Sequence, residues 1–266
     1  MKQRIITAII ALIIFVPFVI IGGLPFEILV YAMATIGFLE LLRMGNIAKY
    51  SIPSILGIGL LWVLLQAEHM DAIPFMWLTK SEILMLIVLL LLSYTVLVKN
   101  KFTFDHAGVV LISAIYVGMG FYYLLLARGG EGGGGLATIL YIFLLIWSTD
   151  TGAYFVGRAF GKHKLWPKIS PNKTIEGALG GILLAIIVSI IFQIVHPIGD
   201  SLVGMIGVAI IASVFGQIGD LVESAFKRHF GVKDSGNVLP GHGGILDRFD
   251  SLLFVLPILH LVGFFN

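Results

Sequence analysis

The sequence predicts an all-α, polytopic membrane protein with about nine transmembrane helices, and two observations point to this class. Hydrophobic residues make up 58% of the 266-residue chain and charged residues only 12%, whereas about a quarter of a soluble domain is usually charged. The apolar residues also form repeated runs of about 15 to 20 residues, and a helix needs roughly 20 to cross a bilayer. One soluble core cannot bury so many such runs, so we expect them to span a membrane.

Nine segments qualify as spans. Their expected bounds are 5–22, 24–42, 52–67, 83–98, 109–127, 136–157, 178–195, 201–219 and 249–265. The third and fourth are short enough to be tilted or partly interfacial. The first is longer than a usual signal-peptide core, and the exit Gly22–Pro25 is not an A-x-A cleavage site, so we expect it to be retained as a span.

The distribution of Lys and Arg indicates the orientation. With the N-terminus in the cytoplasm and the spans alternating, only Lys80 and Arg128 fall outside, which leaves 15 of the 17 basic residues inside. The C-terminus is then outside, and the long polar loops 158–177 and 220–248 share the cytoplasmic face. We therefore expect an integral, multi-pass protein of a plasma or inner membrane, with its polar site facing the cytoplasm.

Polar residues divide the chain into two regions. Residues 1–130 form an N-terminal multi-span region, and residues 131–266 form a C-terminal region with both long polar loops. In the outer loops, Gly129–Gly135 is typical of a flexible linker. The stretch Glu68–Asp71 has three possible metal ligands but no helical His pair, so we expect a solvated loop. The chain has no cysteine, which excludes disulfides, thiolate zinc sites and a thiol nucleophile.

Acidic residues within apolar spans are candidates for functional groups. Glu27 and Glu40 lie near the ends of their spans, so interfacial or structural roles are expected for them. Asp150 lies deeper, about two turns from the cytoplasmic end of the sixth span, and shares one helix face with Tyr154 and Arg158. A structural ion pair would explain Asp150, but we favour a wall of the candidate site because small residues beside it permit close approach of another segment. These small residues are Gly152 and Gly157.

The loop Lys162–Gly177 is rich in Lys and His. Such a cluster often marks only the cytoplasmic side or a contact with anionic lipid. Ser170 or Asn172 is placed to cap the seventh span. Lys173 then sits near the N-terminus of that helix, where exposed N–H groups favour phosphate. A cap does not explain a lysine at the positive end of a helix dipole, so we treat Asn172 and Lys173 as candidate substrate contacts.

The segment 217–250 is the polar centre of the chain, and an apolar run adjoins each of its ends. If the eighth helix continues beyond the membrane interface, five polar residues form one stripe on it, with the acid and hydroxyl nearest the membrane. They are Gln217, Asp220, Ser224, Lys227 and Arg228. Asp247 and Asp250 lie three residues apart at the start of the ninth helix, where the helix dipole alone would favour acids.

Three carboxylates from two helices are expected to reach one interface, and they would repel one another unless a metal ion or basic side chains neutralised them. Oxygen ligands without sulfur suit a hard cation such as Mg²⁺. The glycine-rich turn Pro240–Gly244 has backbone N–H groups that can cradle an anion. His242 in this turn is a phosphate donor, an acid or base, or only a turn residue, and we favour a phosphate contact.

The segment Ser224–Asp250 resembles the signature of the phosphatidate cytidylyltransferase (CDP-diacylglycerol synthase) family. Three groups match without a gap: Ser224-Ala-Phe-Lys227-Arg228, Lys233-Asp234-Ser-Gly236 and Leu239-Pro-Gly-His242-Gly-Gly-Ile-Leu-Asp247-Arg248-Phe-Asp250. The upstream segments 150–158 and 170–177 are also similar to this family. The first 130 residues match only as a generic multi-span region.

The resemblance implies that the lipid phosphate of phosphatidate attacks the α-phosphorus of CTP and gives CDP-diacylglycerol and pyrophosphate. Both reactants are anions, so charge neutralisation and in-line positioning should dominate catalysis. A phosphate monoester is already ionised at neutral pH, so no strong general base is needed. The lipid stays in the leaflet, and CTP arrives from the cytoplasm.

Residue roles follow from the same resemblance. Asp220 and Asp247 are expected to hold Mg²⁺, with Ser224 and Asp250 close by and a second cation left open. The groups expected to hold the phosphates of CTP or lipid are Lys227, Arg228, Lys233, His242 and Arg248. The facing segments are expected to contribute Arg158, Asn172 and Lys173, and Asp150 either orients one of these cations or binds a second ion. Catalysis is expected to depend most on Asp220, Asp247, Lys227 and Arg228.

Two other functions remain open at this point. One is a CTP-dependent lipid kinase acting on a polyprenol or phytol. The complete set of signature residues from Lys227 to Asp250 argues against this kinase. The other is a cation-coupled transporter using intramembrane acids, although such sites usually lie near the midplane between repeated halves. No nucleic-acid partner is expected, and a homodimer is compatible with the sequence without being indicated by it.

Overall fold

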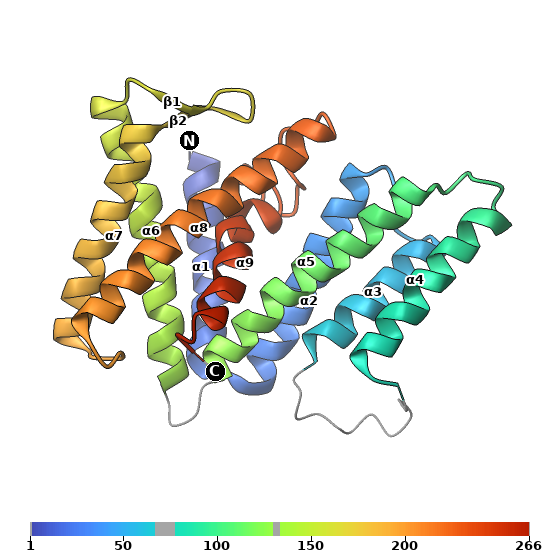
Figure 1. The fold of residues 1–266 in the computed structure, drawn as a ribbon, viewed down its shortest axis with the longest axis horizontal. Helices are drawn as coiled ribbons and strands as arrows, with labels where there is room; N and C mark the ends of the chain where they lie inside the picture. Colours follow the sequence, from blue (N-terminus) through green and yellow to red (C-terminus); the bar gives the residue numbers. More distant parts are fainter. Residues whose placement is uncertain (1, 67–77, 130–133, 266) are drawn as a thin grey trace. The chain divides into compact units, whose positions relative to one another are not determined.

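The computed structural model describes residues 2–66, 78–129 and 134–265 (Figure 1). The helices are α1 Lys2–Ile21, α2 Gly23–Met44, α3 Ile52–Leu65, α4 Lys80–Leu97, α5 Phe104–Gly129, α6 Gly134–Phe160, α7 Ile175–Val195, α8 Leu202–His229 and α9 Leu246–Leu261. Two short strands, β1 Lys164–Trp166 and β2 Ser170–Thr174, lie between α6 and α7. The loop Glu68–Asp71 and residues 130–133 of the glycine linker lie outside the described residues.

Six helices of the described chain are long and apolar enough to cross a bilayer. They are α2, α4, α5, α6, α7 and α8. The apolar helical segments Ile9–Ile21 and Ile52–Leu65 are shorter, and α9 has 16 residues. The helical, polytopic architecture expected from the sequence is therefore confirmed. The count of nine spans and the orientation of the two termini stay predictions.

The chain forms two compact units. The first consists of Met1–Tyr122 together with Asp234–Asp247, and the second consists of Tyr123–Lys233 together with Arg248–Asn266. A polar segment late in the sequence therefore packs with the N-terminal helices. The last residues of this segment are also the first residues of α9.

In the first unit, α2 packs against α1 and α3, and α3 packs against α4. Large apolar side chains fill the interior, among them Phe26, Phe38 and Leu60, which are almost fully buried. Leu246 packs against α2 at Gly37, where an added Cβ atom would lie 3.1 Å from Leu246 Cδ2. This contact brings the start of α9 against the second helix of the chain.

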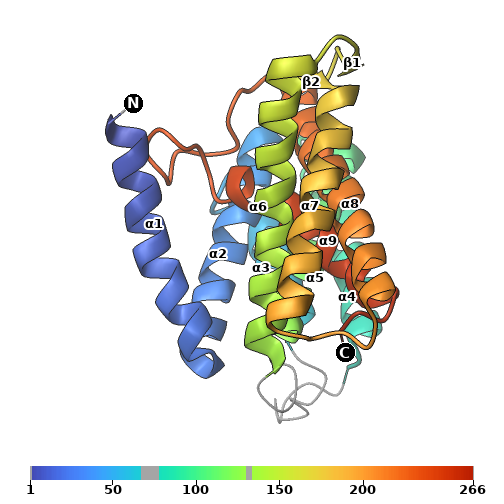
Figure 2. The same cartoon turned by 90° about the vertical axis from the view of Figure 1, so that its left-hand side faces the viewer.

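In the second unit, α6, α7 and α8 lie side by side (Figures 1 and 2). The contact of α6 with α7 is the most extensive in the molecule, and it depends on small residues. A Cβ atom on Gly152 would lie 2.6 Å from the carbonyl oxygen of Gly180, and one on Gly157 would lie 3.0 Å from Thr174 Oγ1. The close approach expected at Gly152 and Gly157 is therefore confirmed.

A buried polar contact also joins these three helices. Ser189 Oγ of α7 donates to the carbonyl oxygen of Met205 in α8 at 3.0 Å, and it lies 2.8 Å from Tyr141 Oη of α6. Tyr141 and Ser189 are both fully buried. An unpaired hydroxyl in an apolar interior costs free energy, so these mutual bonds favour one packing of the three helices.

The loop between α6 and α7 is more ordered than the sequence predicted, because β1 and β2 form an antiparallel hairpin with Lys164 opposite Thr174. The carboxylate of Glu176 accepts hydrogen bonds from the backbone N–H groups of Lys162 at 3.1 Å and His163 at 3.2 Å. Thr174 caps α7 by accepting from the N–H of Gly177 at 3.1 Å. The expectation that Ser170 or Asn172 is the cap was wrong, because the strand continues to Thr174 before the helix begins.

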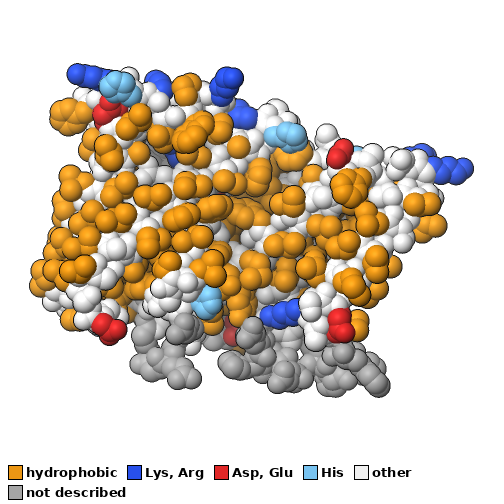
Figure 3. Space-filling model, viewed as in Figure 1, with side chains coloured by type: hydrophobic (Ala, Val, Ile, Leu, Met, Phe, Trp, Pro, Cys, Tyr) orange, Lys and Arg blue, Asp and Glu red, His pale blue; other side chains and the backbone are white. Residues whose placement is uncertain are grey.

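Apolar side chains cover much of the visible surface of the second unit in Figure 3, and Lys side chains gather at the end that carries the hairpin. The exposed lysines of this loop are Lys162, Lys164 and Lys168. Exposed apolar residues on α7 include Leu179, Leu183 and Ile191. An apolar flank with a basic end is the distribution expected of a helix bundle in a membrane.

Candidate functional site

Helix α8 carries the predicted polar stripe as one continuous element. It runs without interruption from Leu202 to His229, beyond the end at residue 219 expected for the span. Its three basic residues, Lys227, Arg228 and His229, occupy the last turn, where the helix dipole favours positive charge. The predicted stripe required that the eighth helix continue past the apolar run, and α8 does so.

Asp220 and Lys173 form the first contact of the candidate site. Lys173 Nζ of β2 lies 2.6 Å from Asp220 Oδ2, and the two side chains are 26% and 33% exposed. Ser224 Oγ donates to Asp220 Oδ1 at 3.3 Å from the next turn of α8. The structure therefore brings together three residues that the sequence analysis selected from two separate segments.

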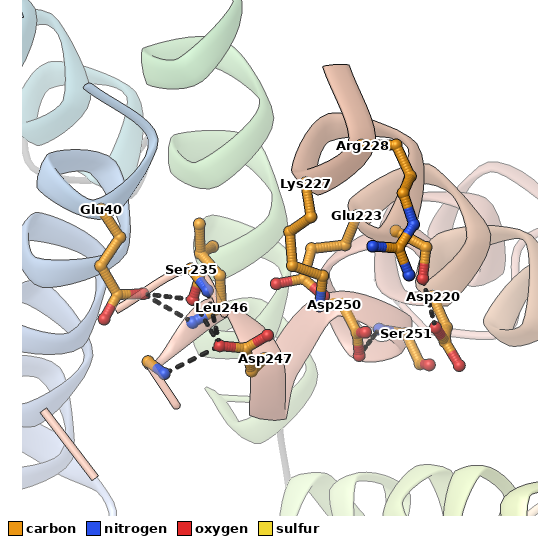
Figure 4. A network of polar contacts seen from close by, with 12 residues as sticks. Glu40, Asp220, Glu223, Lys227, Arg228, Ser235, Leu246, Asp247, Asp250 and Ser251 are labelled. Carbon is orange, nitrogen blue, oxygen red and sulfur yellow. Dashed lines mark hydrogen bonds and ion pairs between the residues drawn. The ribbon is translucent and has the colours of Figure 1, made fainter. Parts of the chain in front are cut away.

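Glu223 is an acid that the sequence analysis did not select. Its side chain is 2% exposed, and its Oε2 lies 2.6 Å from Lys227 Nζ (Figure 4). Their spacing of four residues on a helix is a familiar signal for such a pair and could have identified it. Lys227, expected to bind phosphate, thus already has a buried carboxylate partner.

Asp250, in the first turn of α9 and half-buried, belongs to the same group of charges. Its Oδ1 accepts a hydrogen bond from the N–H of Ser251 at 2.6 Å. Glu223 is within hydrogen-bonding reach of Asp250, and the charges of Asp220 and Lys227 also act on it. Carboxylates this close repel one another, so the group favours an additional positive charge or a shared proton.

Asp150 of α6 faces the same charges. The groups that act on it electrostatically are Asp220, Lys173 and Arg248. Asp150 therefore lies near the acids and bases of α8, α9 and β2, and its role as one wall of the site stays a prediction. Arg158, also on α6, donates from Nη1 to Tyr154 Oη at 3.2 Å, and its predicted contact with substrate stays a prediction.

The donor set of this unit suits a hard cation. Four carboxylates lie in this group, and three basic side chains interact with them. The acids are Asp150, Asp220, Glu223 and Asp250, and the bases are Lys173, Lys227 and Arg248. In the described part of the chain, no three His, Asp or Glu side chains are placed to hold a metal ion by themselves. Mg²⁺ commonly takes only one or two carboxylates and completes its shell with water and substrate phosphates, so the residues fit this ion.

The other predicted phosphate ligands of the second unit lie at its surface. Arg228 Nε donates to the carbonyl oxygen of Ile169 at 3.2 Å, which attaches the hairpin loop to the end of α8. The exposed residues here include Asn172, Lys233 and Arg248. These side chains are accessible to a soluble anion.

Asp247 lies in the first unit and is held by its neighbours. Its Oδ2 accepts hydrogen bonds from the N–H of Ser235 at 2.8 Å, from Ser235 Oγ at 2.8 Å and from the N–H of Gly244 at 2.9 Å (Figure 4). These bonds close the segment 235–247 into a loop. They also fix the orientation of a carboxylate that the sequence analysis selected as a metal ligand.

Glu40 of α2 takes part in the same loop. Its Oε1 accepts from the N–H of Ile245 at 3.0 Å, and its Oε2 accepts from the N–H of Leu246 at 3.0 Å and from Ser235 Oγ at 3.1 Å. The structural role expected for Glu40 agrees with these bonds. Its partners lie about 200 residues away in sequence, and no local pattern could have identified them.

The glycine-rich turn Pro240–Gly244 is closed by bonds within the chain, since the N–H groups of His242 and Gly244 already have acceptors, and its role as an anion cradle stays a prediction. Gly241 and Gly243 have φ angles of 76° and 84°, in the left-handed region that favours glycine. The N–H of Leu239 donates to the carbonyl oxygen of Gly243. The N–H of His242 donates to the carbonyl oxygen of Leu239. Nδ1 of His242 is buried and has no hydrogen-bond partner among the described residues.

The whole chain is similar to known proteins. A family described as "Cytidylyltransferase family" matches residues 2–265. The phosphatidate cytidylyltransferase of Bacillus subtilis (strain 168) is 52% identical over 262 residues, which cover 98% of this chain and 97% of the relative. Those of Staphylococcus haemolyticus and Staphylococcus saprophyticus are 49% and 50% identical over 265 residues, which cover 98% of each chain.

Proposed function

The chain belongs to the cytidylyltransferase family, and we propose that it transfers CMP from CTP to phosphatidate. A phosphate oxygen of phosphatidate attacks the α-phosphorus of CTP, and the bond from that phosphorus to the bridging oxygen of the β-phosphate breaks. CDP-diacylglycerol and pyrophosphate leave. The full-length similarity to curated phosphatidate cytidylyltransferases is the observation that carries this proposal, and the predicted signature residues support it.

The side chains of the second unit suit a reaction between two anions. Lys173 and Lys227 have fixed carboxylate partners, so their ammonium groups are positioned before a substrate arrives. Positive groups held in advance near the developing charge lower the barrier because they need not reorganise during the reaction. The exposed Lys233 and Arg248 are proposed to hold the outer phosphates, together with Arg228 and His242.

A divalent cation, which we take to be Mg²⁺, completes this proposal. Asp220 would hold it, with Ser224 and Asp250 nearby, and Asp247 is a further proposed ligand because it precedes Asp250 by three residues on α9. When bound, the ion supplies positive charge to phosphate oxygens and to the departing pyrophosphate. Asp150 is proposed to orient Lys173 or Arg248.

The test is conversion of phosphatidate by the purified protein in detergent, with CTP labelled in either the cytidine or the γ-phosphate. We expect cytidine label in the lipid and γ-label in pyrophosphate, and both should require Mg²⁺ and disappear with EDTA. Asp220→Asn should abolish turnover. Asp200→Asn, an exposed acid just before α8, is the matched control and should keep full activity.

Each alternative has its own outcome in this assay. Transfer of the γ-label to a polyprenol or phytol, without cytidine in the lipid, would assign the chain to the lipid kinases. A folded protein that turns over no lipid but moves a cation across reconstituted vesicles would favour the transporter. Either result would overturn the proposed reaction. Gel filtration with light scattering would test for a homodimer.

A further inference from the structure

We propose that Glu40 is a positioning residue that acts through Asp247, by holding the loop and helix start that carry this acid. The inference rests on the proposed function and deepens it, since it adds a residue outside the family-like signature. All the contacts that carry it lie within the first unit, between α2 and the segment 235–247.

Glu40 is buried, with 5% of its surface exposed, and both carboxylate oxygens are used. Oε1 accepts from one backbone N–H at the start of α9, and Oε2 accepts from the next N–H and from the Ser235 hydroxyl (Figure 4). The first N–H groups of a helix have no partners within the helix. A carboxylate from another helix therefore performs the capping that a residue just before α9 would otherwise perform.

Ser235 connects Glu40 to Asp247. Its hydroxyl lies 3.1 Å from Glu40 Oε2 and 2.8 Å from Asp247 Oδ2, and its N–H also donates to Asp247 Oδ2 at 2.8 Å. Ser235 is itself 2% exposed. A shift of the Glu40 carboxylate would therefore reach Asp247 through one shared hydroxyl, as well as through the helix start that both acids bind.

Two glycines show that the loop is fitted closely to this carboxylate. A Cβ atom on Gly244 would collide with Glu40 Oε1 and Ser235 Oγ, and one on Gly236 would collide with Glu40 Oε1. The loop thus leaves room for a carboxylate and no room for side chains of its own at these positions. Glutamine has nearly the same shape but only one acceptor oxygen, so its amide group would face an N–H donor and leave it unpaired.

Residues that orient a metal ligand affect affinity or activity strongly although they do not touch the metal. Loss of such a residue typically costs about 10- to 100-fold. We therefore expect Glu40→Gln to change the dependence of the reaction on Mg²⁺, and not only the stability of the protein. Ser235→Ala removes the shared hydroxyl and keeps the backbone contact to Asp247, so it should give a smaller change of the same kind.

The experiment combines hydrogen–deuterium exchange with kinetics on the detergent-solubilised full-length protein. In Glu40→Gln, backbone amides of residues 244–246 should exchange faster, while those of α7 and α8 should not change. The Mg²⁺ concentration for half-maximal activity should rise by about 10- to 100-fold, with the KM for phosphatidate little changed. Glu27→Gln, an exposed acid of the same helix, is the matched control and should leave both readouts unchanged.

The outcomes separate this inference from the proposed function. Unchanged amide exchange in Glu40→Gln would overturn the contact itself. Faster exchange with an unchanged Mg²⁺ requirement would reduce Glu40 to a structural residue and overturn the positioning role, while the proposed reaction would stand. If Glu40→Gln does not fold, amide exchange and the Mg²⁺ requirement are measured on Ser235→Ala, and the same two comparisons decide. Wild-type protein without turnover would overturn the proposed function, and this inference with it.

Discussion

At the residue scale, two ion pairs of α8 differ in what surrounds them. The pair of Lys173 with Asp220 is about one-quarter to one-third exposed, so water and substrate can reach it. In the pair of Lys227 with Glu223, the carboxylate side chain is 2% exposed and the ammonium side chain 16%. Lys173 is therefore more accessible to a phosphate, and Glu223 holds the Lys227 ammonium group in a more buried position at the end of α8.

We expect Lys173→Ala to lower kcat/KM by roughly 100-fold, since removal of one fixed charge donor from an active site has an effect of this size. This pair is more exposed than the pair of Lys227 with Glu223, but Asp220 lies near other acids, so the unfolding temperature should fall by a smaller amount than in Lys227→Met. Lys164→Ala, an exposed lysine of the same hairpin, is the control and should retain activity. Steady-state kinetics with both substrates check this, and a Lys173→Ala variant of normal activity would remove Lys173 from the site.

A different result is expected for the buried pair. Lys227→Met leaves the carboxylate of Glu223 without its lysine partner and should cost about 3–5 kcal/mol of unfolding free energy. The double variant Glu223→Gln/Lys227→Met removes both charges and should recover part of this loss. Denaturant unfolding in detergent compares the three proteins. A single variant as stable as the wild type would contradict the buried pairing.

At the element scale, the close packing of α6 against α7 depends on glycines, which have no side chain to separate the two helices. The two helices touch through glycine, and Gly152 faces the backbone of Gly180 and Gly181. Backbones that approach this closely gain packing contacts that lipid cannot replace. Helix α6 carries Asp150, and both helices also contact β2, the strand that carries Lys173.

Gly152→Ala should therefore lower the unfolding temperature and the activity together, because the added Cβ atom would lie 2.6 Å from the Gly180 carbonyl oxygen and would separate the helices. Gly207→Ala on α8 is the control, since an added Cβ atom there meets nothing within 4 Å. It should be neutral or stabilising by up to about 1 kcal/mol. Thermal unfolding checks both, and equal melting temperatures of the two variants would contradict the close packing.

At the scale of the whole molecule, the six long apolar helices of the described chain fit a polytopic membrane protein, and the orientation remains the prediction from Lys and Arg. The absence of cysteine from the sequence makes this prediction directly testable. We expect Lys164→Cys in the hairpin to react with a membrane-impermeant maleimide only from the cytoplasmic side. Asp200→Cys should react only from outside, and the reverse pattern would invert the topology.

Much of the fold was predictable because apolar run length and helix periodicity are local properties. The close approach at Gly152 was expected from the small residues of the sixth span, and the continuous α8 met a condition that the sequence had left open. The hairpin was missed, because its strands are short and Glu176 stabilises it from the following helix. The cap at Thr174 was missed for the same reason, since the end of a strand decided where α7 begins.

Composition and spacing within single elements were enough to predict the membrane class, the polar stripe and the residue types of the candidate site. Which polar groups meet became known from the packing of the elements, which pairs Lys173 with Asp220 and the buried Glu40 with the start of α9. Glu40 and its partners are separated by about 200 residues. Contacts of this kind depend on packing between distant elements, which leaves no periodic trace along the chain.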